Sequence, residues 1–434
     1  MCVPPRSFVE NVKSHLKRFL WKGKRPKVKY DTVVSMYEMG GIKFQDVEVR
    51  LKTQKIIWIK HLIVNDKNSP WTFVPEFYLK RIGGISSISS NFDMKRIPNN
   101  ILSFYRESLL EWSKFVKKCP ETIEEVKIQP LWNNSYILIN GQSFYDKYFD
   151  SLGVNRVQDL LSENGHLLKW DEFQQVVPGI TANRFLSWMS IRSTIPKEWL
   201  EICKTEQCSK PIENKEETNK YIVALDNFYN VSQLTSKNVY NKLIKQKATW
   251  PTALTKWSEI IDVDKEKWQK YYVAIHQVSL DMYSREFQYK ILHNYLPVNK
   301  LLYKWKLTQS PRCSYCFLEL ETLTHLFCDC IVIKNFYYKL HSWLENIHIM
   351  LPPQGYESIL CGILPVNKNL LINQLILTFK MTIYFNRKEK IIDLFMDFVR
   401  RIKYLQKVEY IIAQEKDKLH VHLTKWEKLL SYLL

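Results

Sequence analysis

Glycine and proline are scarce in this chain. Only 11 glycines and 17 prolines occur among its 434 residues. A turn-rich all-β fold uses more of both residues, because tight turns depend on their special backbone angles. The composition therefore argues against that fold class. Glycine-rich phosphate-binding loops are also missing, which argues against a P-loop or dinucleotide-binding fold.

Long apolar segments are missing as well. The N-terminal sequence MCVPPRSF is too short and too polar for a secretion signal. The longest uncharged apolar runs, near residues 358–367 and 369–379, fall short of the roughly 18 residues that a membrane span needs. We therefore predict no transmembrane segment and no membrane partner. The odd count of nine cysteines, most of them far apart, fits a reducing compartment, the cytoplasm or the nucleus.

Acidic residues are the minority among the charged ones. The chain has 63 basic and 44 acidic residues, which gives a net charge of +19. Such an excess favours a polyanionic partner, most often nucleic acid. The alternative is a solvated basic surface without a partner. At 434 residues the chain is long enough for two or three domains. Hydrophobic residues make up 46% of it and aromatic residues 14%, which is enough for packed cores.

Helical periodicity dominates the sequence. Apolar residues recur at helical spacing over most of the chain, and Asp46 stands where it can cap the helix that follows it. Asn140-Gly141 predicts a hairpin turn between two short strands. We predict a mainly α, multi-helical fold with this short β-hairpin region mid-chain and a small zinc-binding loop–helix unit. The predicted regions are a basic helical region at 1–65, a helical linking domain at 66–200, a linker at 201–220, a zinc-binding domain at 221–350 and C-terminal helices at 351–434 that pack on it.

The stretch PRCSYCFLELETLTHLFCDC, residues 311–330, holds four of the nine cysteines and one of the ten histidines. Read as ligands, Cys313, Cys316, His325 and Cys330 suit tetrahedral Zn²⁺ with no position left for water, which makes the predicted site structural. Cys328 is an alternative fourth ligand, because residues three apart on a helix share a face. The competing interpretation is that these cysteines are free and buried in a core.

Two basic stretches lie beside aromatic residues, a combination that suits binding to a nucleic-acid backbone and stacking on bases. We predict nucleic-acid contacts from both, with a solvated surface as the alternative. The residues are Lys17, Arg18, Lys22, Lys24, Arg25, Lys27 and Lys29 in the first stretch, and Arg285, Lys290, His293, Lys300, Lys304 and Lys306 in the second.

Three segments together resemble one family, the non-LTR (LINE-type) retrotransposon reverse transcriptases. FLWKGKRPKVKYDTVVSMYEMGGIKFQDVEVRLKTQKIIWIKHL resembles the thumb-containing region after the polymerase palm, and LWNNSYILINGQSFYDKYFDSLGVNRVQDLL is similar to the section that follows. The segment with Leu296-Pro297-Val298-Asn299, the cysteine pair, Glu321-Thr322 and His325-Leu326-Phe327 resembles the family's C-terminal zinc-binding segment. This resemblance implies Cys330, not Cys328, as the fourth ligand.

The catalytic parts of that family are missing from the sequence. The family's palm carries paired aspartates that hold two Mg²⁺ ions, and this chain has no Asp-Asp pair. Its Asp-x-Asp, Asp262-Val263-Asp264, is predicted to lie on the surface. The family's endonuclease is not recognised either. The resemblance therefore implies a C-terminal portion, a truncated copy or a frame that begins late.

We expect a non-catalytic protein that binds template RNA or target DNA and takes no small-molecule substrate. An upstream polymerase segment is a further candidate partner. The alternatives are a part of an active RNA-directed DNA polymerase once joined to an upstream palm, and an inert structural zinc protein.

Overall fold

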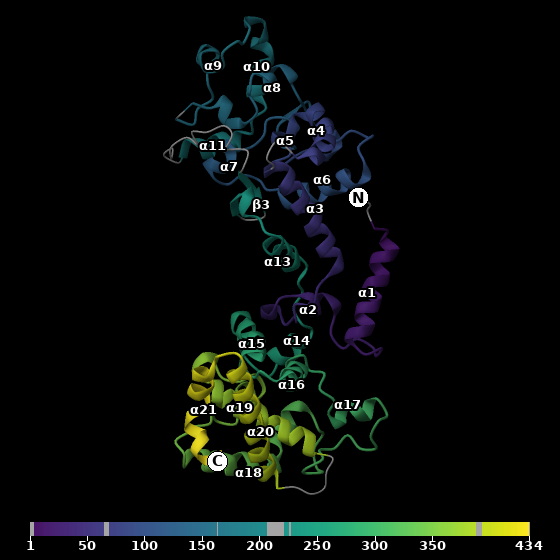
Figure 1. The fold of residues 1–434 in the computed structure, drawn as a ribbon, viewed down its shortest axis with the longest axis vertical. Helices are drawn as coiled ribbons and strands as arrows, with labels where there is room; N and C mark the ends of the chain where they lie inside the picture. Colours follow the sequence, from purple (N-terminus) through teal and green to yellow (C-terminus); the bar gives the residue numbers. More distant parts are fainter. Residues whose placement is uncertain are drawn as a thin grey trace. The chain divides into compact units, whose positions relative to one another are not determined.

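The computed structural model describes residues 4–64, 69–162, 164–205, 221–224, 227–387 and 393–433. These residues form two compact units, each built from separate stretches of the chain. The first unit contains Met1–Leu16 and Asp46–Leu243, and the second contains Lys17–Gln45 and Ile244–Leu434. Helices dominate both units, as Figure 1 shows, which confirms the predicted fold class. Within the described residues, no helix combines the length and apolar character that crossing a bilayer requires.

The first unit is helical with two small hairpins. In its largest interhelical contact α3 packs on α6, where Ile59, Leu109 and Trp112 are buried. A separate aromatic core surrounds Trp132 and Trp188. The elements that lie wholly in this unit are α3 (Val47–Val64), α4 (Phe73–Leu79), α5 (Gly84–Ser87), α6 (Ser103–Phe115), α7 (Ile123–Lys127), β1 (Leu138–Ile139), β2 (Gln142–Ser143), α8 (Lys147–Ser151), α9 (Trp170–Val176), α10 (Phe185–Ser193), α11 (Lys197–Thr205), β3 (Tyr221–Ala224) and β4 (Asn227–Asn230).

The predicted hairpin turn and the predicted helix cap in the first unit are confirmed. Strands β1 and β2 pair antiparallel around Asn140-Gly141, whose φ angles of 49° and 74° are those of a type I′ turn. The Asp46 side chain accepts a 2.9 Å hydrogen bond from the backbone N–H of Val49 and so caps α3. The hairpin β3–β4 was not predicted. Residues 201–205 of the predicted linker end helix α11, and residues 206–220 lie outside the described part of the chain.

The second unit has one large core. It is formed by α2 (Tyr30–Val34), α14 (Ala253–Ser258), α15 (Lys265–Val278), α16 (Met282–Leu292), α17 (Asn299–Lys304), α18 (Ile331–Glu345), α19 (Leu370–Asn386), α20 (Leu394–Glu415) and α21 (Leu419–Leu433). Helices α1 (Arg6–Leu20) and α13 (Ser236–Lys247) contribute residues to both units.

Residues 17–45 are part of the second unit although most of that unit begins at residue 244. Val28 and Val33 are buried in its core. Gly40 allows this segment to pass close to Pro251, because it has a φ of 71° and a Cβ there would lie 2.6 Å from Pro251 Cγ. The predicted division into five regions stays a prediction.

A buried ion pair joins α20 to α21. Lys425 Nζ donates to both carboxylate oxygens of Glu409, at 2.8 and 3.0 Å, and Trp426 Nε1 donates to the same carboxylate at 2.9 Å. Lys425 also donates to the Val278 carbonyl at 3.1 Å and to Gln374 Oε1 at 3.3 Å, which connects the pair to α15 and α19. Burial lowers the pKa of Lys425, so the cation depends on the Glu409 carboxylate.

We predict that Glu409→Gln lowers the free energy of unfolding of the second unit by about 3–5 kcal/mol, because it leaves the Lys425 charge buried without a counter-ion. Urea unfolding followed by tryptophan fluorescence measures this. The double variant Glu409→Gln/Lys425→Met should recover much of the loss, since it removes both charges. Equal loss in the single and double variants would contradict the assignment.

Candidate metal centre and nucleic-acid interface

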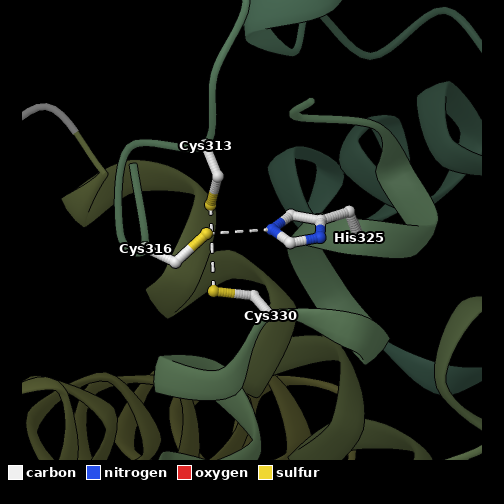
Figure 2. A group of neighbouring side chains, drawn as sticks. All are labelled: Cys313, Cys316, His325 and Cys330. Carbon is white, nitrogen blue, oxygen red and sulfur yellow. Dashed lines mark hydrogen bonds between the residues drawn. The ribbon is translucent and has the colours of Figure 1, made fainter. Parts of the chain in front are cut away.

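The four predicted ligands converge. The ligand atoms of Cys313, Cys316, His325 and Cys330 all lie within 4.8 Å of one another, and Figure 2 shows the three sulfurs and the imidazole pointing toward a common centre. Cys313 Sγ lies 3.8 Å from Cys330 Sγ, and Cys316 Sγ lies 3.3 Å from His325 Nε2. A tetrahedral zinc ion with Zn–S of about 2.3 Å and Zn–N of about 2.0–2.1 Å sets these separations near 3.8 and 3.5 Å. The four residues therefore fit zinc.

The first two ligands lie on a tight turn. Cys313 N–H donates to the Glu319 carbonyl at 2.8 Å, and Phe317 N–H donates to the Cys313 carbonyl at 3.0 Å. An isolated β-bridge between Arg312 and Leu320 closes the loop. Tyr315 N–H points at Cys313 Sγ, 3.5 Å away, so the turn offers a backbone donor to this sulfur. Such a donor favours the thiolate form that a metal needs.

A π-helical turn, His325–Asp329, decides which cysteine is the fourth ligand. Cys330 N–H donates to the His325 carbonyl at 2.9 Å, the i+5 to i hydrogen bond of a π-helix. This turn places residue 330 beside residue 325. Cys328 is instead buried outside the cluster, and burial raises the pKa of its thiol to about 12. The resemblance-based choice of Cys330 agrees with this geometry.

Cys330 also occupies the N-cap position of α18. A hydrogen bond from Cys313 lowers the pKa of the Cys330 thiol, and the backbone N–H groups of Ile333 and Val332 contribute to the shift. The same Cys313–Cys330 hydrogen bond raises the pKa of Cys313. A thiolate at a helix N-terminus is stabilised by the helix dipole, so α18 prepares one ligand for a cation.

A fully buried carboxylate, Glu321, holds the first two ligands in place. They lie on the loop at 312–320, which we call the metal loop. Glu321 accepts hydrogen bonds from the backbone N–H groups of Asn299 at 2.7 Å and Ser314 at 2.9 Å. Arg387 Nη1 forms an ion pair with it at 2.9 Å, and Arg387 Nη2 donates to the Pro297 carbonyl at 2.7 Å. Glu321 therefore ties the turn between the first two cysteines to the start of α17 and to the end of α19.

Glu321 and Asn299 are part of the motif that carries the resemblance, which assigns them no role, and Arg387 was not predicted. Arg387 lies 66 positions after its partner, so no local pattern identifies it. Two acidic residues, Glu319 and Glu321, lie between the second and third ligands, and the sequence does not indicate which of them forms the ion pair.

The structure places both basic stretches in the second unit and brings them into contact. Lys27 Nζ lies 4.5 Å from the centroid of the Trp305 ring, at the end of α17. Trp21 makes an edge contact with Tyr295, with ring centroids 6.2 Å apart. Val28, next to Lys27, anchors the loop in the core. Two stretches separated by more than 250 residues thus form one surface.

Most of the predicted nucleic-acid residues are exposed on this surface, which we call the basic surface. The exposed members are Arg18, Lys22, Lys24, Arg25, Lys27, Lys29, Lys300, Lys304 and Lys306. Lys17 is half-buried and lies 5.0 Å from the Tyr30 ring centroid. Exposed positive charges of this kind are the groups that bind phosphates.

The predicted nucleic-acid residues on α16 and at its end contribute less positive charge to the basic surface. His293 is buried against Tyr289, with ring centroids 4.0 Å apart, and burial lowers the pKa of its imidazole to about 4. It is therefore neutral and does not belong to the basic surface, because its helix position points into the core. Arg285 donates to the Ser279 carbonyl at 2.6 Å, and Lys290 pairs with Glu286 at 2.7 Å.

One comparison with known proteins matches this region. Residues 234–336 match the family model for zinc-binding in reverse transcriptase. The match contains α17 and all four residues of the cluster. This region of the chain is related to the zinc-binding segment of reverse transcriptases. No curated protein shows a significant match to it.

We predict that the purified chain contains one zinc ion per molecule and that Cys330→Ser loses it, because three ligands hold zinc less tightly than four. Cys328→Ala should keep the zinc, since Cys328 lies outside the cluster. Metal analysis by mass spectrometry distinguishes the two variants. Chelation should lower the melting temperature of the second unit by about 8–16 °C. Loss of zinc in both variants to the same extent would contradict this ligand set.

We also predict that Glu321→Gln weakens zinc binding by about 10–100-fold, the effect expected when a residue that orients the ligands is lost. The free energy of unfolding should fall by about 3–5 kcal/mol, since the Arg387 charge stays buried without its partner. Competition with a chromophoric chelator measures the affinity. Glu319→Gln, an exposed change in the same loop, is the matched control and should have little effect on either quantity.

Proposed function

We propose that the chain is a non-catalytic, nucleic-acid-binding C-terminal portion of a LINE-type reverse transcriptase polyprotein. In this proposal a structural zinc ion fixes the metal loop and α17, and the basic surface binds the phosphate backbone of template RNA or target DNA. The contact of Lys27 with Trp305 carries the proposal, because it joins two predicted binding stretches into one surface beside the metal centre. The match over 234–336 and the net charge of +19 support it.

The expected absence of catalysis rests on the sequence. Nucleotidyl transfer by two metal ions needs carboxylates that share both ions, and the chain has no Asp-Asp pair. In the described part of the chain, the only cluster of three or more potential metal ligands is the Cys₃His group. We therefore assign polymerisation to an upstream polymerase segment, which is the proposed protein partner. A nucleic-acid partner also places the protein in the cytoplasm or the nucleus.

The zinc ion contributes rigidity in this proposal. With four protein ligands it has no open position for water or substrate, so it supplies folding energy and no hydrolytic chemistry. Glu321 passes that rigidity to α17 through Asn299. The lysines on and after α17 are then held in a fixed arrangement, which reduces the entropy lost when they bind phosphates.

We predict that the triple variant Lys24→Ala/Arg25→Ala/Lys304→Ala weakens nucleic-acid binding by about tenfold or more at moderate salt. The slope of log K against log salt should fall by about 2–3, because each lost phosphate contact reduces counterion release. Fluorescence anisotropy with labelled single-stranded RNA and double-stranded DNA, at several salt concentrations, measures both quantities.

The control is Lys416→Ala/Lys418→Ala/Lys428→Ala, which removes the same charge from exposed sites on α21 and just before it. Figure 1 shows α21 and α17 at different sides of the second unit. Equal weakening by both triple variants would reduce the proposal to nonspecific attraction. Binding that does not depend on salt, or primer extension by the purified chain, would overturn it.

A further inference from the structure

The second unit contains a cavity of about 540 Å³ that the zinc cluster and the basic surface do not use. Its wall is formed by residues 260–262 after α14, by the first half of α15 and by the segment 352–364, which contains the π-helical turn Glu357–Cys361. Ile260 and Tyr356 at its rim are both more than a third exposed, so the cavity opens to solvent. Its volume lies within the range of about 300–1,000 Å³ that is usual for ligand sites.

The charge inside this cavity is opposite to that of the chain. Its charged lining residues are Asp262, Lys267 and Glu357. Lys267 Nζ is neutralised by Glu357 Oε1 at 2.5 Å, and the Tyr271 hydroxyl also donates to Glu357. Asp262 has no ion-pair or hydrogen-bond partner within the described residues. One uncompensated carboxylate therefore faces a cavity in a protein of net charge +19.

The carboxylate of Glu357 is fixed and ionised. Burial alone would raise its pKa, but the hydrogen bonds from Lys267 and Tyr271 together lower it. A further carboxylate stands behind the rim, since Tyr356 donates its hydroxyl to Asp329 Oδ1 at 3.1 Å. The tyrosine ring is thus held at the opening, where its face can meet a cation.

The two aspartates of the Asp-x-Asp have different roles. Asp264 caps α15 by accepting a 2.7 Å hydrogen bond from Lys267 N–H, so its carboxylate is engaged in the helix. Asp262 lines the cavity. Within the described residues, Asp262 and Glu357 belong to no cluster that could hold a metal ion. The cavity therefore suits an organic cation better than a divalent metal.

We propose that this cavity binds the guanidinium side chain of an arginine in a basic peptide segment of a partner protein. The planar fork of arginine donates two parallel N–H groups to one carboxylate, and Asp262 is the lining carboxylate that has no partner within the described residues. Its aliphatic stem packs against Ile260 and Ile363, and its charge faces the Tyr356 ring. Charge complementarity favours a basic partner, because the lining of the cavity carries a net negative charge. An acidic cavity does not favour binding of nucleic acid, which is also negatively charged.

The test uses the full 434-residue chain and the peptide Ac-Ala-Ala-Arg-Ala-Ala-NH₂ in isothermal titration calorimetry. A peptide with citrulline in place of arginine has the same shape without the charge and should bind at least about tenfold more weakly. Asp262→Asn should weaken arginine-peptide binding about 10–100-fold. Glu259→Gln, an exposed change three residues away that does not line the cavity, should leave binding unchanged.

Several outcomes would overturn the proposal: equal binding of the arginine and citrulline peptides, equal effects of Asp262→Asn and Glu259→Gln, or preferential binding of a glutamate peptide, which would assign the site to Lys267. Because Asp262 makes no hydrogen bond within the described residues, Asp262→Asn should fold normally, and its melting temperature checks this. The proposed nucleic-acid function depends on other residues, so a negative result here would not contradict it.

Discussion

The second unit depends on a carboxylate that no water reaches. Glu321 is fully buried, and such a charge is tolerated only when it is paired and its oxygens accept hydrogen bonds. Arg387 supplies the opposite charge, and backbone N–H groups from the metal loop and from α17 supply the bonds. The metal ligands, the lysine-bearing helix and the end of α19 are therefore positioned by one interaction, which must form for any of them to be in register.

The metal loop and the basic surface are connected by direct contacts between their residues. The cysteine turn is fixed to α17 through Glu321, and the loop at residues 22–29 rests on Trp305 through Lys27. Cys330 links the cluster to the core as well, because this ligand is also the N-cap residue of α18. A rigid metal centre therefore restricts the motion of the surface lysines, because few contacts separate them: the hydrogen bonds of Glu321, helix α17 and the cation–π contact of Lys27 with Trp305. This arrangement suits a binding platform better than a reactive site.

Features that depend on neighbouring residues were predictable from the sequence. The hairpin follows from the backbone preference of Asn140-Gly141, the start of α3 from the side chain of Asp46, and the metal cluster from ligand spacing. Features that depend on distant pairing were not. Nothing near Lys27 indicates Trp305, nothing near Glu321 indicates Arg387, and the apolar surroundings that bury His293 come from several elements. Helical periodicity identifies a face but not its neighbour.

The discontinuous second unit has a consequence for the order of folding during synthesis. Residues 17–45 leave the ribosome nearly 200 residues before the helices against which Val28 and Val33 pack. The intervening stretch, 46–243, contains its own buried clusters and is complete before the rest emerges. Since domains generally fold as units while the chain grows, that stretch can mature first. The apolar side chains of residues 17–45 then stay uncovered until the helices after residue 244 have been made.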